Sequence, residues 1–282
     1  MHSTPRWQFV LYLAGTVALT IACLAVARRQ APDPGRATAT QVVHFPADWK
    51  AGDKRPAIVF FFGGGWSKGS VGQFEDQARH LASRGMVAAR ADYRVKSRDN
   101  VTPEACVADA QDALRYLSEH ADELGIDRDK IVAAGGSAGG HLAACTSLSP
   151  AIEPRNTELP RPVALVLYNP VVRFEGEPRL MSRIDDNEEL GRKLSPVLWL
   201  KKDSPPALLL YGTKDQLKAQ GDEFVELAKK LQLRAEMYSA EGQGHGFFNR
   251  SPWKERTSQR VDEFLTSLGL LEAASKSADQ GK

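Results

Sequence analysis

Cysteine and net charge are both scarce in this sequence, and each shortage excludes a class of protein. Three cysteines in 282 residues are too few for a disulfide scaffold, and their spacing matches no metal-binding motif. The formal net charge of +2 is too small to indicate a polyanionic partner such as nucleic acid. Cys106 and Cys145 lie beside apolar residues on expected helices, so we predict two buried free thiols rather than a disulfide.

The length and the hydrophobic content favour one folded domain. A chain of 282 residues that is 42% hydrophobic can bury one sizeable core, which we place at residues 41–271. Residues 30–40 (QAPDPGRATAT) are expected to be a linker, and residues 272–282 a flexible polar tail.

An uncharged segment precedes this domain. Residues 9–27 carry no charge and stand between Arg6 and the basic pair at 28–29. The segment is long for the hydrophobic core of a signal peptide and just long enough to span a bilayer. A small-x-small site at 25–27 allows cleavage, whereas the basic pair disfavours translocation and leaves an uncleaved anchor open. Either alternative predicts an exported protein, periplasmic or extracellular, that meets a membrane only through residues 1–29.

Strand and helix patterns alternate along the expected domain. Amphipathic patterns predict helices, among them one that follows Thr102 and one that begins at residues 251–252. Such alternation is typical of a mostly parallel sheet with helices on both faces, in which ligands bind at the carboxyl ends of the strands. Short apolar runs predict the strands at residues 57–62, 86–91, 131–134, 163–168, 207–211 and 234–238.

A serine lies at one of these strand ends. The sequence GGSAG at residues 135–139 fits the pattern G-x-S-x-G, and it follows a strand and opens a helix. Glycines let the backbone turn tightly beside the serine, which raises the Ser137 hydroxyl above the surface. Serine is a poor nucleophile until a base takes its proton, and an acid must orient that base. The pattern therefore predicts a nucleophile whose two partners lie elsewhere in the chain.

Two residues fill these places in the order Ser, Asp, His that this kind of sheet requires. Asp215 lies in GTKD, directly after the run at 207–211, and His245 lies in GHGFF, after the last predicted strand. Asp222 is the alternative acid, but we expect it to cap the following helix. His141, one turn after Ser137, is the alternative base, and we expect it to be structural because the order requires a distal base.

A third element is FGGGW at residues 62–66, at the carboxyl end of the first strong strand. Acyl transfer places negative charge on the carbonyl oxygen, and fixed N–H groups stabilise that charge. Three successive glycines allow the backbone to turn its N–H groups toward such an oxygen.

With these motifs, the chain resembles the α/β-hydrolases of the bacterial esterase and lipase group that includes hormone-sensitive-lipase-like enzymes and acetyl esterases. The resemblance covers about residues 56–269. It implies that Ser137 is the nucleophile, Asp215 the acid and His245 the base. It also implies an oxyanion hole, with no metal and no organic cofactor. The implied oxyanion donors are the N–H groups of Gly64, Gly65 and Ala138.

Two features depart from that group. Phe62 stands where the group has a histidine that ties down the glycine loop, so we expect packing to hold the loop here. There is also no room for a helical cap before the first strands. An insertion at residues 171–203 between two strands is the other candidate cover, and its sequence is rich in Arg, Glu and Asp. Such a segment is poorly suited to line a deep apolar channel.

These observations predict a serine carboxylesterase that acts on short-acyl, in particular acetyl, esters of a small molecule or a carbohydrate. Two alternatives remain open at this stage. A peptidase or amidase can use the same triad, and a non-catalytic binding module can retain the same fold. The sequence does not indicate an oligomeric state.

Overall fold

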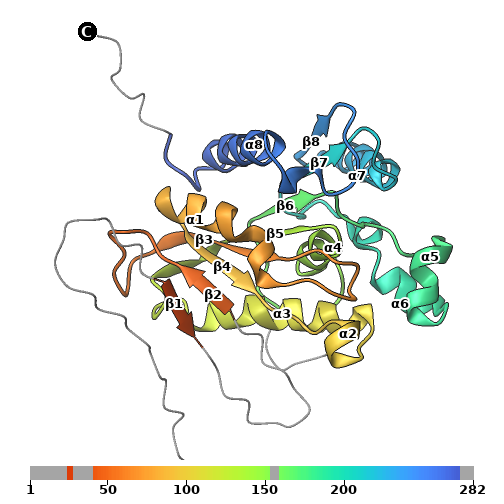
Figure 1. Ribbon diagram of the computed structural model, residues 1–282, viewed down its shortest axis with the longest axis horizontal. Helices are drawn as coiled ribbons and strands as arrows, with labels where there is room; N and C mark the ends of the chain where they lie inside the picture. Colours follow the sequence, from red (N-terminus) through yellow and green to blue (C-terminus); the bar gives the residue numbers. More distant parts are fainter. Residues whose placement is uncertain (1–23, 28–40, 153–158, 274–282) are drawn as a thin grey trace, which may run out of the picture.

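The computed structural model describes residues 24–27, 41–152 and 159–273, and its centre is an eight-stranded sheet (Figure 1). The strand order is β1-β2-β4-β3-β5-β6-β7-β8. β1 and β2 are antiparallel to their neighbours at one edge, and the other strand pairs are parallel. The strands are β1 (Leu24–Ala27), β2 (Gln41–His44), β3 (Arg55–Phe61), β4 (Val87–Ala91), β5 (Ile126–Gly136), β6 (Ala164–Tyr168), β7 (Ala207–Gly212) and β8 (Ala235–Ala240).

Helices cover both faces of the sheet, which is why the central strands read as continuous apolar runs. α1 (Glu75–Ser83) and α8 (Trp253–Ser267) pack on one face, and α3 (Pro103–Glu119), α4 (Ala138–Cys145) and α7 (Lys218–Lys230) pack on the other. Side chains of β3 alternate between the two cores. Ile58 and Phe60 join the α1 and α8 side, while Val59 and Phe61 join the α3 and α4 side.

The strand order reverses at β3, and this reversal determines where a site can form. After β3 the chain moves to β4 on one side, then crosses back to β5 on the other side and continues outward to β8. The loops that follow β3 and β5 therefore leave the same edge of the sheet next to each other. In doubly wound sheets ligands bind in the crevice at such a reversal.

The insertion between β6 and β7 consists of short helical turns that lie beside α3 and α4 (Figure 1). Four of its apolar side chains, Phe174, Ile184, Leu194 and Val197, are each at most 3% exposed, whereas Trp199 is 39% exposed. These four side chains pack inward against the core. The turns are α5 (Pro178–Met181), η2 (Ser182–Ile184), α6 (Glu188–Lys193) and η3 (Pro196–Trp199).

Before β3 the described residues contain no helix. Residues 1–23 of the expected export segment lie outside the described residues, as do the linker and residues 274–282 of the tail. Leu24–Ala27, near the end of the expected export segment, form β1, which pairs with β2. Within the described ranges, no helix has the length and apolarity needed to cross a membrane.

The remaining short turns lie around the carboxyl edge of the sheet. The turns are η1 (Val71–Phe74), α2 (Lys96–Asp99) and η4 (Phe247–Asn249). The two thiols of the described chain, Cys106 and Cys145, are free and buried, as predicted. Burial raises the pKa of each thiol to about 12, so both remain protonated at neutral pH.

Candidate active site

Ser137 occupies a strained turn between β5 and α4. Its φ of 53° and ψ of −116° are rare for a residue with a side chain, and its N–H donates to the carbonyl of Tyr168 at 2.8 Å. The turn brings α4 against the end of β3. A Cβ atom on Gly139 would lie 2.0 Å from the Phe61 carbonyl oxygen, so only glycine fits there. The local sequence thus produces the turn that its pattern predicted.

His245 connects the serine to the acid. Its Nε2 lies 2.8 Å from the Ser137 Oγ, and its Nδ1 lies 2.9 Å from Oδ2 of Asp215. Because Asp215 accepts at Nδ1, the proton sits there, and Nε2 is free to accept the serine proton. The structure therefore brings together the three residues that the sequence predicted, from the ends of β5, β7 and β8.

Burial differs sharply between the acid and the histidine. The Asp215 side chain is 1% exposed, whereas the His245 side chain is 44% exposed. The second carboxylate oxygen of Asp215 accepts the Leu217 N–H at 2.9 Å, which fixes its orientation. A buried, fixed carboxylate can hold the ring while the reacting edge of the ring stays open to a substrate.

The alternative acid and base lie elsewhere. Asp222 does not cap a helix, because α7 begins at Lys218. It forms an ion pair with that lysine one turn earlier, so the cap expectation was wrong. His141 is fully buried and structural. Its Nδ1 accepts the Trp66 indole N–H at 3.3 Å, and its Nε2 donates to the Leu194 carbonyl at 2.8 Å. Burial lowers the pKa of His141 to about 4, so the ring is neutral at neutral pH.

Packing and hydrogen bonds together hold the glycine loop. Phe62 stacks on Tyr93 with ring centroids 4.1 Å apart, and the Tyr93 hydroxyl donates to the Phe62 carbonyl at 2.6 Å. The Gly63 N–H donates to Oε1 of Gln73 at 2.6 Å. Gly64 has a φ of 133°, and a Cβ atom there would lie 2.0 Å from the Lys68 carbonyl oxygen. The expectation that packing holds the loop was right about Phe62 but missed the bonds from Tyr93 and Gln73.

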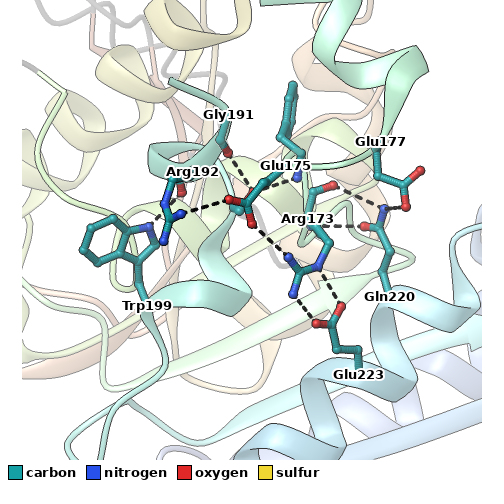
Figure 2. Close-up of polar contacts among 10 residues, drawn as sticks. Arg173, Glu175, Glu177, Gly191, Arg192, Trp199, Gln220 and Glu223 are labelled. Atoms are coloured by element: carbon teal, nitrogen blue, oxygen red, sulfur yellow. Dashed lines mark hydrogen bonds and ion pairs between the residues drawn. The ribbon is translucent and has the colours of Figure 1, made fainter. Parts of the chain in front are cut away.

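Hydrogen bonds and ion pairs fasten the insertion to α7 (Figure 2). The Arg173 guanidinium pairs with the carboxylate of Glu223. Oε1 of Gln220 accepts the Arg173 N–H at 3.1 Å, and its Nε2 donates to the Arg173 carbonyl at 3.2 Å. A third connection reaches the glycine loop itself, where the Arg183 guanidinium donates to the Gly65 carbonyl at 3.0 Å. These contacts explain why a charge-rich insertion has a defined position.

An open cavity of about 420 Å³ adjoins the triad. It is lined by Lys214, Asp215, Gln216, Leu217 and His245, and Leu217 is the one apolar side chain among these five. A larger cavity of about 950 Å³ lies at the opposite edge of the sheet, next to Arg55 and Lys130, and no triad residue lines it. A substrate in the open cavity would contact His245, whereas a substrate in the larger cavity would contact no triad residue. Among the described residues, no group of three or more His, Cys, Asp or Glu side chains is placed to hold a metal ion.

Three side chains beside the site were not predicted from the sequence. Gln73, Asn169 and Asn249 form hydrogen bonds to the backbone on either side of the triad. Asn169 follows the strand predicted at 163–168 and so lies at the carboxyl edge, which was a usable signal. Gln73 and Asn249 follow no predicted strand directly, and no local pattern marks them.

The sheet is doubly wound, and its carboxyl edge carries a serine elbow, a buried acid and a histidine, in this order along the chain. This combination defines a class, the serine hydrolases of the α/β-hydrolase fold. Comparisons with known proteins agree. The family model described as BD-FAE matches residues 43–163. The apo form of esterase 2 from Thermogutta terrifontis is 40% identical with a TM-score of 0.81, covering 89% of this chain and 96% of that one.

The same esterase with bound propionate is 42% identical with a TM-score of 0.79, covering 84% of this chain and 92% of that one. Esterase LipC of Mycobacterium tuberculosis is 28% identical over 218 residues, which are 68% of this chain and 53% of that protein. The chain spans about half the length of most of the curated relatives it matches. It belongs to the hormone-sensitive-lipase-like esterases of the α/β-hydrolase fold and is, by class, a serine carboxylic ester hydrolase. The predicted family and fold class are confirmed.

Proposed function

We propose that the protein hydrolyses short-acyl carboxylic esters, acetyl esters in particular, through an acyl-enzyme. In this proposal Ser137 is the nucleophile, His245 the general base and Asp215 the group that orients the base. The observation that carries it is the unbroken contact from Ser137 Oγ through the ring of His245 to the buried Asp215 carboxylate.

In the first half of the reaction, Ser137 Oγ forms a bond to the ester carbonyl carbon while its proton moves to His245 Nε2. The carbonyl electron pair moves onto the oxygen. When it returns, the bond to the alcohol oxygen breaks, and His245 gives that oxygen the proton. Water then attacks the acyl-serine with the same histidine as base, releasing the acid and restoring Ser137.

The N–H groups of Gly64, Gly65 and Ala138 are proposed to stabilise the negative oxygen. Two observations support them. The Gly63 N–H is already engaged by Gln73, whereas these three donate to no acceptor within the described part of the chain. Ala138 is also the first residue of α4, where backbone N–H groups lack helical partners. Removal of one such donor typically costs about 100- to 1,000-fold in kcat.

The preference for short acyl groups rests on the surroundings of the triad. The adjoining cavity is open, and Leu217 is the one apolar side chain among the five that line it. In the insertion, Phe174, Ile184, Leu194 and Val197 are buried in the core and do not face this cavity. Neither feature offers a long apolar channel. Two related structures are of the Thermogutta esterase with propionate and with butyrate bound, and both are short acids. The open side leaves room for a bulky alcohol, such as a glycoside or polysaccharide.

A chain-length series tests this proposal. With p-nitrophenyl acetate, butyrate, octanoate and decanoate, kcat/KM should be highest for acetate or butyrate. Each acyl CH₂ that finds apolar surface adds about 0.8 kcal/mol, so a real channel would make kcat/KM rise along the series. A maximum at octanoate or longer would contradict the short-acyl proposal. Faster hydrolysis of matched anilides than of esters would favour the amidase alternative.

The acyl-enzyme itself needs a separate measurement. A fluorophosphonate should add one adduct to the intact mass of the wild-type chain and none to that of Ser137→Ala. One related structure is described as the Thermogutta esterase phosphonylated by sarin, so this chemistry is known for that protein. Equal labelling of both chains would remove Ser137 from its proposed role.

A further inference from the structure

A series of hydrogen bonds made by side-chain amides connects the glycine loop at Gly63 to the loop that carries His245. They begin at Gln73, whose Oε1 accepts the Gly63 N–H at 2.6 Å. The Nε2 of Gln73 donates to Oδ1 of Asn249 at 3.1 Å, and Nδ2 of Asn249 donates to the Gly246 carbonyl at 2.9 Å. Gly246 directly follows His245. Two loops that are about 180 residues apart in the chain are therefore tied together.

Asn169 continues this chain from the other side of the histidine. Its Oδ1 accepts the Gly246 N–H at 3.1 Å, and its Nδ2 lies 3.4 Å from His245 Nε2. Since an N–H must face an acceptor, the bond from Gly246 fixes which end of the amide is oxygen. The NH₂ group is then the end that faces the reacting nitrogen of the histidine.

The backbone at Asn169 is adapted to this place. Its φ of 37° lies in the left-handed region, which asparagine tolerates better than other side chains do. Its own N–H donates to the Leu210 carbonyl at 2.7 Å, and the residue is fully buried. A buried amide that meets two groups of the histidine loop is held by its surroundings and can position that loop.

We propose that Asn169 and Gln73 are positioning residues for ester hydrolysis, joined through Asn249. Gln73 fixes the glycine loop at Gly63, next to the proposed oxyanion donors, and Asn169 fixes His245 through Gly246. This inference rests on the proposed function. It assigns part of the work of the missing histidine to Gln73, because Phe62 has no side-chain group that can bond to the loop.

The pH profile of Asn169→Asp tests the first half. The aspartate keeps an oxygen for the Gly246 N–H, but it puts a negative charge where the NH₂ group faces His245 Nε2. A carboxylate within about 4 Å favours the protonated ring, so the acid limb of the kcat/KM profile should move up by about one pH unit. A purely structural role would not move this limb.

Asn100→Asp is the matched control for that variant. Asn100 also has a positive φ, of 52°, but it is exposed and ends α2, and the same change in net charge occurs there. Its profile should match that of the wild type. An acid limb that is the same in Asn169→Asp, Asn100→Asp and the wild type would overturn the role of Asn169.

Gln73→Met tests the second half. It keeps the size of the side chain but removes both hydrogen bonds, so the donors next to Gly63 lose their fixed place. Loss of a transition-state contact should lower kcat about 10- to 100-fold and leave KM within about threefold. Gln259→Met changes an exposed glutamine of α8 and should leave both constants unchanged.

The outcomes separate this inference from the proposed function. An active wild-type chain whose Gln73→Met variant keeps its kcat within twofold would overturn the role of Gln73 alone. If the folded wild-type chain hydrolyses no ester, the proposed function fails, and the inference fails with it. Thermal unfolding of each variant identifies any that have not folded. Asn169→Asp is expected to fold, because aspartate and asparagine have nearly the same shape.

Discussion

The indole N–H of Trp66 donates to Nδ1 of His141 across 3.3 Å, and this contact joins the glycine loop to α4, the helix that follows Ser137. The opposite nitrogen of the ring donates to the Leu194 carbonyl in the insertion. Both bonds require a neutral ring with its proton on Nε2. His141 therefore holds three segments together only while it remains uncharged.

This requirement predicts how stability depends on pH. Burial lowers the pKa of His141 to about 4 from an ordinary value near 6.5. Between these values the unfolded chain binds the proton and the folded chain does not. The free energy of unfolding therefore has its full value above about pH 6.5. It decreases as the pH falls toward 4, by at most about 1.4 kcal/mol per pH unit.

Urea unfolding at several pH values between 4 and 7 measures this slope. His44 has its pKa lowered to about 4 as well, by burial and by the charge of Arg90, so it adds a slope of the same sign. The variant His141→Gln should flatten the dependence without abolishing it. An identical slope for His141→Gln and the wild type would contradict the prediction.

The triad should behave as one unit. Ser137→Ala or His245→Ala should each lower kcat by several orders of magnitude, and the double variant should cost little more than either, because either change already disables the shared step. Steady-state rates with p-nitrophenyl acetate measure this. For the acid, Asp215→Asn should lower kcat strongly. Asp222→Asn should lower it only slightly, because Asp222 only pairs with Lys218 on the surface. Equal losses at Asp215 and Asp222 would refute the assignment of the acid.

The two glycines proposed as oxyanion donors should differ in their tolerance of a methyl group. In Gly64→Ala the new Cβ meets the Lys68 carbonyl oxygen at 2.0 Å, and the φ of 133° is nearly closed to alanine, so the loop must move. In Gly65→Ala the Cβ lies 3.8 Å from the nearest Arg183 atom, and a φ of 62° costs about 1 kcal/mol. We expect kcat to fall at least about 100-fold in Gly64→Ala and about tenfold or less in Gly65→Ala. The reverse order of sensitivity would argue against the described loop conformation.

We also propose that residues 1–29 direct export, because residues 9–27 are uncharged and lie between arginines. Fractionation of cells that make the full chain should find it outside the cytoplasm or in the membrane fraction. Intact mass then distinguishes cleavage from anchoring. Cleavage after Ala27 would remove Leu24–Ala27 and thus β1 from the edge of the sheet. Cytoplasmic protein that retains Met1 would refute both alternatives.

The sequence alone determined the parallel sheet, the elbow at Ser137 and the order of Asp215 and His245. These features depend on local signals, namely apolar runs, glycines beside a serine and acidic or basic residues directly after a strand. Residues that follow parallel strands all lie at the same edge of the sheet. Residues distant in the chain could therefore be assigned to one site before any contact between them was known.

Only the tertiary structure decided what supports that site. The bond between Gln73 and Asn249 joins residues 176 positions apart, and the contact of Trp66 with His141 spans 75. Such pairs leave no period or motif in the sequence, since either residue is ordinary by itself and gains its role from the backbone it meets after folding. The same reason explains the error at Asp222. α7 begins at Lys218 without a side-chain cap, so no capping residue in the sequence marks its start.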